Sequence, residues 1–124
     1  MKESLTPHSK TLVIPTEYDD FDHFYDENKV HVYKAIIEVF NNFLTSRKKT
    51  LSLAINAKIQ GVTWNTDFTF NIEKDIETLM RDIMPYFIEH EMYEVCAEVK
   101  HIYDKLSVKN LKHQKRALKK NLIS

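Results

Sequence analysis

With Thr66 as the exception, apolar residues occupy every second position in two consecutive stretches, residues 51–59 and 62–70. A period of two is typical of a β-strand with one buried face. Between the stretches lies Gln60-Gly61, and this only glycine of the chain stands where a two-residue turn requires positive φ. The pattern predicts an antiparallel hairpin over residues 50–71. Its register places the apolar positions on one face, opposing Ile59 to Val62, Ala57 to Trp64, Ile55 to Thr66, Leu53 to Phe68 and Leu51 to Phe70.

A third strand and a helix are predicted before the hairpin. The short β-branched run at residues 11–14 predicts a strand that ends at Pro15 and can lie at an edge of the hairpin. Residues 30–44 carry apolar side chains at intervals of three and four, which is typical of an amphipathic helix. Asn28 or Asp26 is the expected cap at the start of this helix.

Two further apolar stripes with helical spacing follow the hairpin, over residues 72–90 and 92–106. Asn71 is the expected cap of the first of these helices. Pro85 lies inside the first stripe, which keeps its phase across the proline, so a kinked or re-initiated helix is expected there. A hairpin of two helices explains the pattern better than one helix of about 35 residues, which would be long for a small domain.

Together these elements predict an α+β fold. It consists of a small antiparallel sheet, formed by the hairpin with residues 11–14 as a candidate third strand, and about three helices packed on one face. The expected division is a flexible arm at residues 1–10, a single domain at 11–106 and a basic, partly helical tail at 107–124. A chain of 124 residues is long enough for one self-standing core. The expected core consists of Tyr33, Ile36, Ile37, Phe40, Leu51, Leu53, Ile55, Trp64, Phe68, Phe70, Ile76, Leu79, Met80, Ile83, Phe87, Val95, Cys96, Val99 and Ile102.

The overall charge indicates no particular partner, because 18 Lys and Arg residues balance 18 Asp and Glu residues. The single cysteine, Cys96, excludes an intramolecular disulfide and fits a reducing compartment. The sequence has no apolar run of about 18 residues, so no transmembrane helix is expected. Its first ten residues are polar, unlike a secretory signal. The expected location is the cytoplasm, which for a phage-encoded protein means the host cytoplasm or the virion.

The most unusual composition lies at residues 17–28, which we term the acidic aromatic segment. Six acids alternate there with four aromatic residues at roughly helical spacing. One interpretation is an acidic loop whose aromatic side chains cover the sheet. The other is a recognition segment, in which rigid aromatic side chains contact a partner inside an acidic rim. The candidate partner-binding residues are Tyr18, Phe21, Phe24 and Tyr25.

The C-terminal stretch is strongly basic, with seven Lys or Arg residues and no acid between residues 105 and 124. Such a segment can be a solvated helix, a nucleic-acid contact that neutralises phosphates, or a helix that binds a protein partner. It contains none of the aromatic residues that stack on bases. The candidate residues for contact with nucleic acid or a protein partner are Lys109, Lys112, Lys115, Arg116, Lys119 and Lys120.

The sequence contains no pattern typical of catalysis, cofactor binding or metal binding. No two of the six histidines have the spacing of three or four that places two ligands on one helix face, and there is no second cysteine. No serine lies in a Gly-x-Ser-x-Gly context, and one glycine cannot form a phosphate-binding loop. Cys96 lies on an apolar stripe and is expected to be buried. We therefore expect no catalytic residue, cofactor or metal, and a protein that is not an enzyme.

Residues 91–106 contain Tyr93-Glu94, Cys96-Ala97 and a later Leu106. This stretch resembles the UVR motif, a helical hairpin found in excision-repair proteins and in some kinase-activator and chaperone-associated proteins. The second helix of that motif reads Tyr/Phe-Glu-x-Ala-Ala-x-Leu-Arg-Asp, followed by Leu. Lys100-His101 stands here in place of the Arg-Asp pair. The resemblance implies a hairpin that contacts proteins and has no catalytic role.

For function, the two charged segments and the missing catalytic patterns favour a non-catalytic protein-interaction or assembly protein. Its partner would be another protein or a second copy of the chain, in a homo- or hetero-oligomer, and no membrane partner is expected. Richness in Lys, Asn and Ile is compatible with an AT-rich genome, so an accessory or structural protein of a phage or bacterium is the candidate class. The alternative is a nucleic-acid-binding adaptor that acts through the basic tail.

Overall fold

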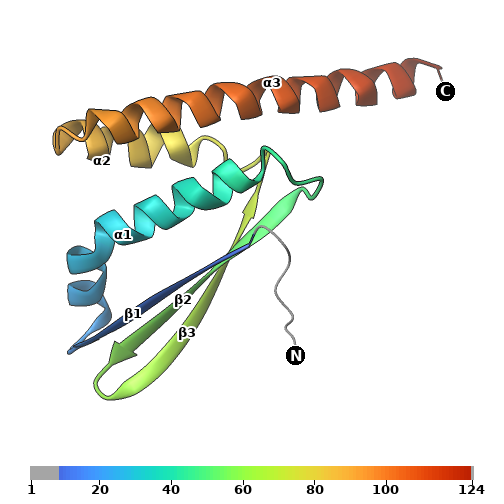
Figure 1. Cartoon of the computed structure of the whole chain (residues 1–124). Helices are drawn as coiled ribbons and strands as arrows, with labels where there is room; N and C mark the ends of the chain where they lie inside the picture. The colour runs from blue at the N-terminus through green and yellow to red at the C-terminus, as the bar shows by residue number, and fades with distance from the viewer. Residues whose placement is uncertain (1–8, 124) are drawn as a thin grey trace. The chain divides into compact units, whose positions relative to one another are not determined.

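The computed structural model describes residues 9–123, with side chains described for residues 9–112 (Figure 1). It confirms an α+β fold with a three-stranded sheet. The chain divides into two compact units, one that ends at Asn71 and one that begins at Ile72. The arm expected at residues 1–10 lies mostly outside the described residues. At its end, the Ser9 hydroxyl accepts a hydrogen bond from the backbone N–H of Ser52, and a strand begins at Lys10.

The predicted hairpin is confirmed in its register. Strand β2 (Thr50–Ile59) pairs antiparallel with strand β3 (Val62–Asn71), and all five predicted apolar pairs are opposed as expected. Gln60 and Gly61 both have positive φ, 51° and 76°, which is the geometry of the tight turn that matches strand twist. A Cβ on Gly61 would meet only a Glu17 carboxylate oxygen at 3.8 Å, so the backbone conformation alone requires glycine there.

The third strand exists, but it is longer than predicted and runs parallel to its neighbour. Strand β1 (Lys10–Tyr18) pairs with β2, so the sheet is mixed, with the order β1-β2-β3. Pro15 does not end the strand as the sequence predicts. The register shifts around it instead, because the chain takes four steps from Val13 to Glu17 while β2 takes two. Such an irregularity tolerates a proline, which has no N–H to give to the ladder.

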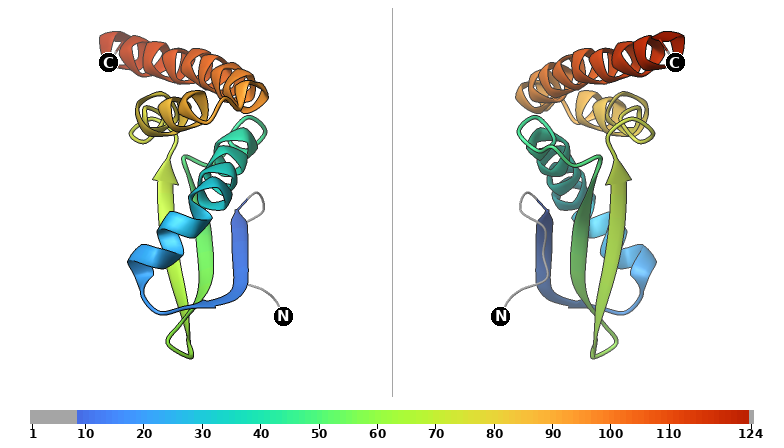
Figure 2. Two further views of the ribbon diagram at one scale, coloured as in Figure 1. Left: turned by 90° about the vertical axis from the view of Figure 1, so that its left-hand side faces the viewer. Right: turned by 90° about the vertical axis from the view of Figure 1, so that its right-hand side faces the viewer.

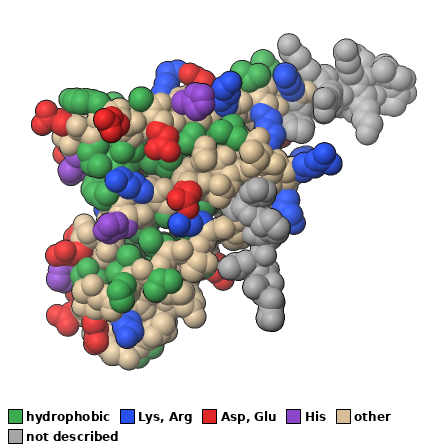
Figure 3. Space-filling view, viewed as in Figure 1, with side chains coloured by type: hydrophobic (Ala, Val, Ile, Leu, Met, Phe, Trp, Pro, Cys, Tyr) green, Lys and Arg blue, Asp and Glu red, His purple; other side chains and the backbone are tan. Residues whose placement is uncertain are grey.

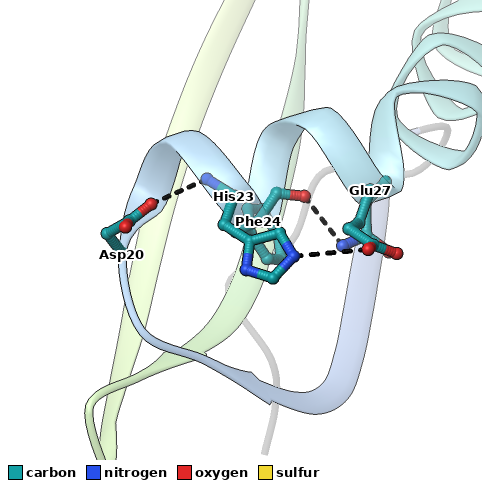
Figure 4. Close-up of polar contacts among 5 residues, drawn as sticks. Asp20, His23, Phe24 and Glu27 are labelled. Atoms are coloured by element: carbon teal, nitrogen blue, oxygen red, sulfur yellow. Dashed lines mark hydrogen bonds and ion pairs between the residues drawn. The ribbon is translucent and has the colours of Figure 1, made fainter.

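Helix α1 (Phe21–Asn42) connects the two parallel strands and begins well before the predicted residue 30. Its cap is Asp20, and neither Asn28 nor Asp26 has that role. The Asp20 carboxylate accepts a hydrogen bond of 2.8 Å from the backbone N–H of His23 (Figure 4). One turn later, the His23 ring lies 3.3 Å from a Glu27 carboxylate oxygen. The acidic aromatic segment is therefore the end of β1, a short connection and the first turns of this helix.

The core of the first unit lies between α1 and one face of the sheet (Figure 2). The buried amide of Asn28 donates to the backbone carbonyl of Phe24, which satisfies a polar group inside this layer. Two residues of the predicted core, Trp64 and Phe68, are exposed. The prediction that these two side chains are buried is therefore wrong. They are exposed because they lie on β3, whereas α1 packs mainly on β1 and β2. The fully or nearly buried apolar side chains of this unit are Phe24, Ala35, Ile36, Ile37, Val39, Phe40, Phe43, Leu51, Leu53, Ile55, Ala57 and Ile59.

The second unit begins with turns where the sequence predicts a helix from residue 72. Helical structure starts with a single π-helical turn, η1 (Leu79–Ile83), and continues as α2 (Met84–Glu89). In the wider turn the N–H of Met84 bonds to the carbonyl of Leu79, and the α-helix restarts with Pro85 in its first turn. Proline is tolerated there because a first-turn N–H has no helical partner. The prediction of a re-initiated helix at Pro85 is thus confirmed.

The two helices of the second unit are joined by a tight turn without glycine. The N–H of Met92 donates to the carbonyl of Phe87 at 2.9 Å, and the N–H of Glu91 donates to the carbonyl of Ile88 at 3.0 Å. This pair of bonds defines a Schellman motif, with Glu91 as the left-handed residue at φ 56°. Helix α3 (Tyr93–Ile123) follows and runs without a break through the expected tail boundary at residue 107.

We expect Glu91→Gly to stabilise the second unit by about 1 kcal/mol, because glycine adopts positive φ without the strain of a side chain. Urea denaturation followed by far-UV circular dichroism measures the change. Glu89→Gly is the matched control. Glu89 is the last residue of α2, so the same substitution there should destabilise the unit. An unchanged or lower midpoint for Glu91→Gly would contradict the role of this turn.

Two hydrogen bonds tie the turns after Asn71 to α3. The hydroxyl of Tyr103 donates to the Glu77 carboxylate at 2.8 Å. The buried amide of Asn110 donates to the backbone carbonyl of Ile72 at 3.1 Å, while the amide oxygen of Asn110 has no hydrogen-bond partner among the described residues. Since Asn110 is buried and lies beyond residue 107, the first part of the expected tail belongs to the packed second unit.

Candidate functional site

Strand β3 exposes apolar side chains on the face of the sheet that carries the core. Val62, Trp64 and Phe68 are 52%, 47% and 38% exposed. The β2 residues directly opposite them lie on the same face, yet these residues, Ile59, Ala57 and Leu53, are only 5%, 4% and 0% exposed. The hydrophobic face of the sheet therefore extends beyond its covered part. We refer to Val62, Trp64 and Phe68, with Phe21 beside them, as the apolar strip.

The position of α1 explains why the strip is exposed. The helix packs mainly on β1 and β2, and ring contacts from Phe21 and Phe40 reach β3 near its two ends. Near the hairpin turn, Phe21 meets Trp64 edge-on with 5.5 Å between ring centroids. Near the other end, Phe40 meets Phe70 at 5.6 Å. Phe68 lies between these contacts along the strand, and its side chain is exposed.

A hollow of about 280 Å³ lies where the strip meets the start of α1. Apolar Val62, Trp64 and Phe21 form part of its wall, and the acidic residues Asp19 and Asp20 also line it. Figure 3 shows acidic side chains beside hydrophobic ones over this end of the first unit. An apolar surface with an acidic rim suits an apolar side chain flanked by cations. The hollow is lined by Asp19, Asp20, Phe21, Ile59, Gln60, Val62 and Trp64.

The four predicted partner-binding aromatics have different environments. Phe24 is fully buried, in edge-on contact with Tyr18 and Tyr25, so it supports the core and is not accessible to a partner. Tyr18 and Tyr25 are half-buried. Phe21 is exposed and lies in the apolar strip. The segment is no loop, but Phe24 packs in the core as the first interpretation expects, and the recognition interpretation stays a prediction.

The sequence prediction missed the contribution of β3 to this surface. Alternation correctly places Val62, Trp64 and Phe68 on the core-facing side, but alternation cannot tell a covered strand from an uncovered one. The sequence feature that could have indicated an uncovered strand is the connection between β1 and β2, which holds a single helix. One helix covers about two strands, so a three-stranded sheet with a single connecting helix leaves part of its face open.

The described part of the basic tail carries both cations and apolar residues. Lys112 is exposed, while Lys109 is half-buried and has an interaction within the chain. Val108 and Leu111 are exposed on the same helix. The backbone of α3 continues to Ile123, but the side chains of the other candidates, Lys115, Arg116, Lys119 and Lys120, lie outside those that the structure describes.

The pKa shifts found among the described residues have local causes. The hydrogen bond from Arg81 lowers the pKa of Asp82, and the hydrogen bond to Glu77 raises the pKa of Tyr103. Both shifts arise from direct contacts at an exposed surface, so they indicate local pairing. Cys96 is half-buried, contrary to the predicted core position. Over the described residues, no group of three or more potential ligands could hold a metal, and no helix is long and apolar enough to cross a membrane.

Comparisons with family models, with curated proteins and with solved structures found no match to this chain. The relation of residues 91–106 to the UVR motif therefore stays a prediction. In the structure this stretch comprises the end of the turn at Glu91 and the first half of α3.

Proposed function

We propose that this protein is a non-catalytic interaction or assembly protein, with the apolar strip and its acidic rim as one contact surface and the basic end of α3 as another. This extends the sequence-based hypothesis from the acidic aromatic segment alone to the adjoining strand. An accessory or structural role in a phage or bacterium, in the host cytoplasm or the virion, fits this proposal. The partner is another protein or a second copy of the chain.

The observation that carries the proposal is the exposure of three large apolar side chains on the core-facing side of β3. Burying such side chains is favourable by about 25 cal/mol for each Å² of apolar surface. Tryptophan and phenylalanine at the centre of a contact surface commonly provide much of its binding energy. A partner that covers the strip would complete the hydrophobic face that α1 leaves open.

The second surface is complementary to the first in charge. From Lys105 onward the chain has seven cations and no acid, and Val108 and Leu111 are exposed among them. An amphipathic basic helix of this kind fits an apolar surface with a carboxylate rim. Opposite charges increase the rate of encounter and suppress wrong partners more than they raise affinity.

Concentration-dependent association of the purified chain tests the proposal. Trp64 is the only tryptophan and is half exposed, so covering the strip should shift its fluorescence emission to shorter wavelength. We expect this shift between about 1 and 100 μM, a range typical of weak to moderate association. Light scattering over the same range should show the increase in mass.

Phe68→Ser should weaken this association about tenfold or more, because it removes a large apolar contact. Val13→Ser is the matched control, since Val13 is also an exposed apolar residue of the sheet but lies on β1. Its association should stay within about twofold of the original chain. A strict monomer that also captures no partner from its host's extract would contradict the proposal.

A nucleic-acid-binding adaptor remains the second candidate. The observation that favours it is the continuous helix α3, which carries the seven cations of residues 105–124. The absence of an aromatic residue in that stretch disfavours binding to single strands by stacking. Oligonucleotide binding that weakens steeply with salt, and that is lost when the exposed cations become glutamine, would favour this function.

A further inference from the structure

We propose that the free edge of β3 pairs with the same edge of a second copy, in antiparallel orientation about a twofold axis, and so joins two sheets into one of six strands. This inference rests on the proposed function and specifies its partner. Edge pairing adds backbone hydrogen bonds to the proposed contact through the apolar strip. The added strand would also extend the face of the sheet that carries the strip.

The two edges of the sheet differ in a way that selects β3. The outer strand β1 contains Pro15, a register shift, and charged Lys10 and Glu17. Proline, charges and irregularities are the devices that protect an edge against pairing. Strand β3 has ten consecutive pairs with β2, no proline and no irregularity. Its only charge is Asp67. Among the described residues β3 pairs with no strand other than β2, so it offers a long, regular edge.

The hairpin determines which backbone groups of β3 point outward. In a hairpin closed by two residues, the flanking pair exchanges both backbone hydrogen bonds, and here that pair is Ile59 and Val62. Even-numbered residues of β3 therefore bond to β2. Odd-numbered residues, from Thr63 to Thr69, direct their N–H and C=O groups to the outer edge. A second β3 in antiparallel orientation offers the same groups in return.

The side chains then select one register. Apolar positions meet apolar positions only if Thr66 pairs with another even-numbered residue. When Thr66 pairs with the partner's Thr66, Trp64 faces the partner's Phe68 and Val62 faces the partner's Phe70. These pairs are not hydrogen-bonded, so their side chains approach most closely. Both strips then merge into one continuous apolar surface, with aromatic pairs on both sides of the axis.

Charge complementarity supports a second copy as the occupant in this register. The carboxylate of Asp67 faces the partner's Asn65, whose amide can donate a hydrogen bond to it. A shift that centres the axis on Asp67 would oppose two carboxylates, which is unfavourable. Thr63 faces the partner's Thr69, a pair that is also favourable on the polar face. The strand is thus self-complementary on both faces in the register centred on Thr66.

Two lysine substitutions at neighbouring positions test the register. Thr66→Lys places two lysines opposite each other at the axis, and should weaken self-association at least about tenfold. Asn65→Lys adds the same charge one residue away, but the new lysine faces the partner's Asp67 in two symmetric pairs. It should tighten association by about threefold to tenfold. Sedimentation measures both, and Trp64 fluorescence in urea checks that each variant is folded.

Thr66→Cys in a Cys96→Ala background provides a second measurement that does not depend on affinity. Opposed residues at the axis would have Cα atoms about 4.5 Å apart, within the range that a disulfide spans. Mild oxidation should convert most of this variant to a covalent dimer. Val13→Cys in the same background is the control on the other edge and should form no covalent dimer.

The outcomes separate this inference from the proposed function. If association persists but Thr66→Lys and Asn65→Lys have equal effects and Thr66→Cys does not cross-link, edge pairing is wrong and the interaction function stands. If the chain is monomeric yet binds another protein through the strip, a second copy as the occupant is wrong. Opposite effects of the two lysines together with the cross-link would establish the paired edge.

Discussion

Phe24→Ala is expected to destabilise the first unit by about 3–5 kcal/mol, the usual cost of removing a fully buried phenylalanine. Phe24 has no exposed surface and contacts two tyrosine rings, and its backbone carbonyl accepts the bond from buried Asn28. Urea denaturation followed by Trp64 fluorescence measures the loss, because Trp64 lies in the same unit and is the only tryptophan.

Phe21→Ala is the matched control within the same helical turn. Its side chain is exposed and contacts Trp64, so the expected loss of stability is about 1 kcal/mol, while self-association should weaken. The two variants therefore separate the aromatic residue that holds the fold from the one that contacts a partner. Equal losses of stability for Phe24→Ala and Phe21→Ala would contradict this assignment.

Leu53→Ala should cost the first unit about 2–5 kcal/mol, since Leu53 is fully buried on the central strand. Phe68→Ala changes the residue directly opposite on β3 and removes a larger side chain. Because Phe68 is partly exposed, we expect the smaller loss there, about 1 kcal/mol at a concentration where the chain is monomeric. Urea denaturation followed by Trp64 fluorescence compares the losses of stability of the two variants.

This comparison tests the asymmetry of the sheet directly. If Phe68→Ala costs as much as Leu53→Ala in the monomer, the strip is covered within the chain itself and is no contact surface. If the cost of Phe68→Ala rises with protein concentration while that of Leu53→Ala stays constant, the difference reports the free energy of association.

The hairpin was predictable because its information is local. The alternation of apolar residues sets the face of each strand, and Gly61 sets the turn, so the complete register follows from residues 50–71. The helical hairpin of the second unit was predictable for a similar reason, since each apolar stripe repeats with the helical period.

Features that depend on competition between neighbouring residues were not predictable in the same way. Six acids crowd residues 17–28, and several of them could have capped a helix. Asp20 has this role because β1 continues to Tyr18, which leaves only a short connection before the helix. The length of β1 in turn depends on how Pro15 is accommodated, which only pairing with β2 decides.

Only part of the candidate site could be predicted from the sequence. The sequence indicated the acidic aromatic segment, and one of its aromatic residues, Phe21, lies in the strip. It could not indicate that β3 is the uncovered strand or that Phe24 belongs to the core. Both depend on where α1 crosses the sheet, and tertiary packing decides that position.

The irregular strand β1 has a consequence for the size of any assembly. A sheet with two regular edges can add copies at both, and such growth has no natural end. Here Pro15 and the register shift make one edge unsuitable, so a twofold contact through β3 occupies the one edge that is regular among the described strands of each copy. The expected product is a closed pair, and fibres should form only if the outer edge is made regular, for example by Pro15→Val.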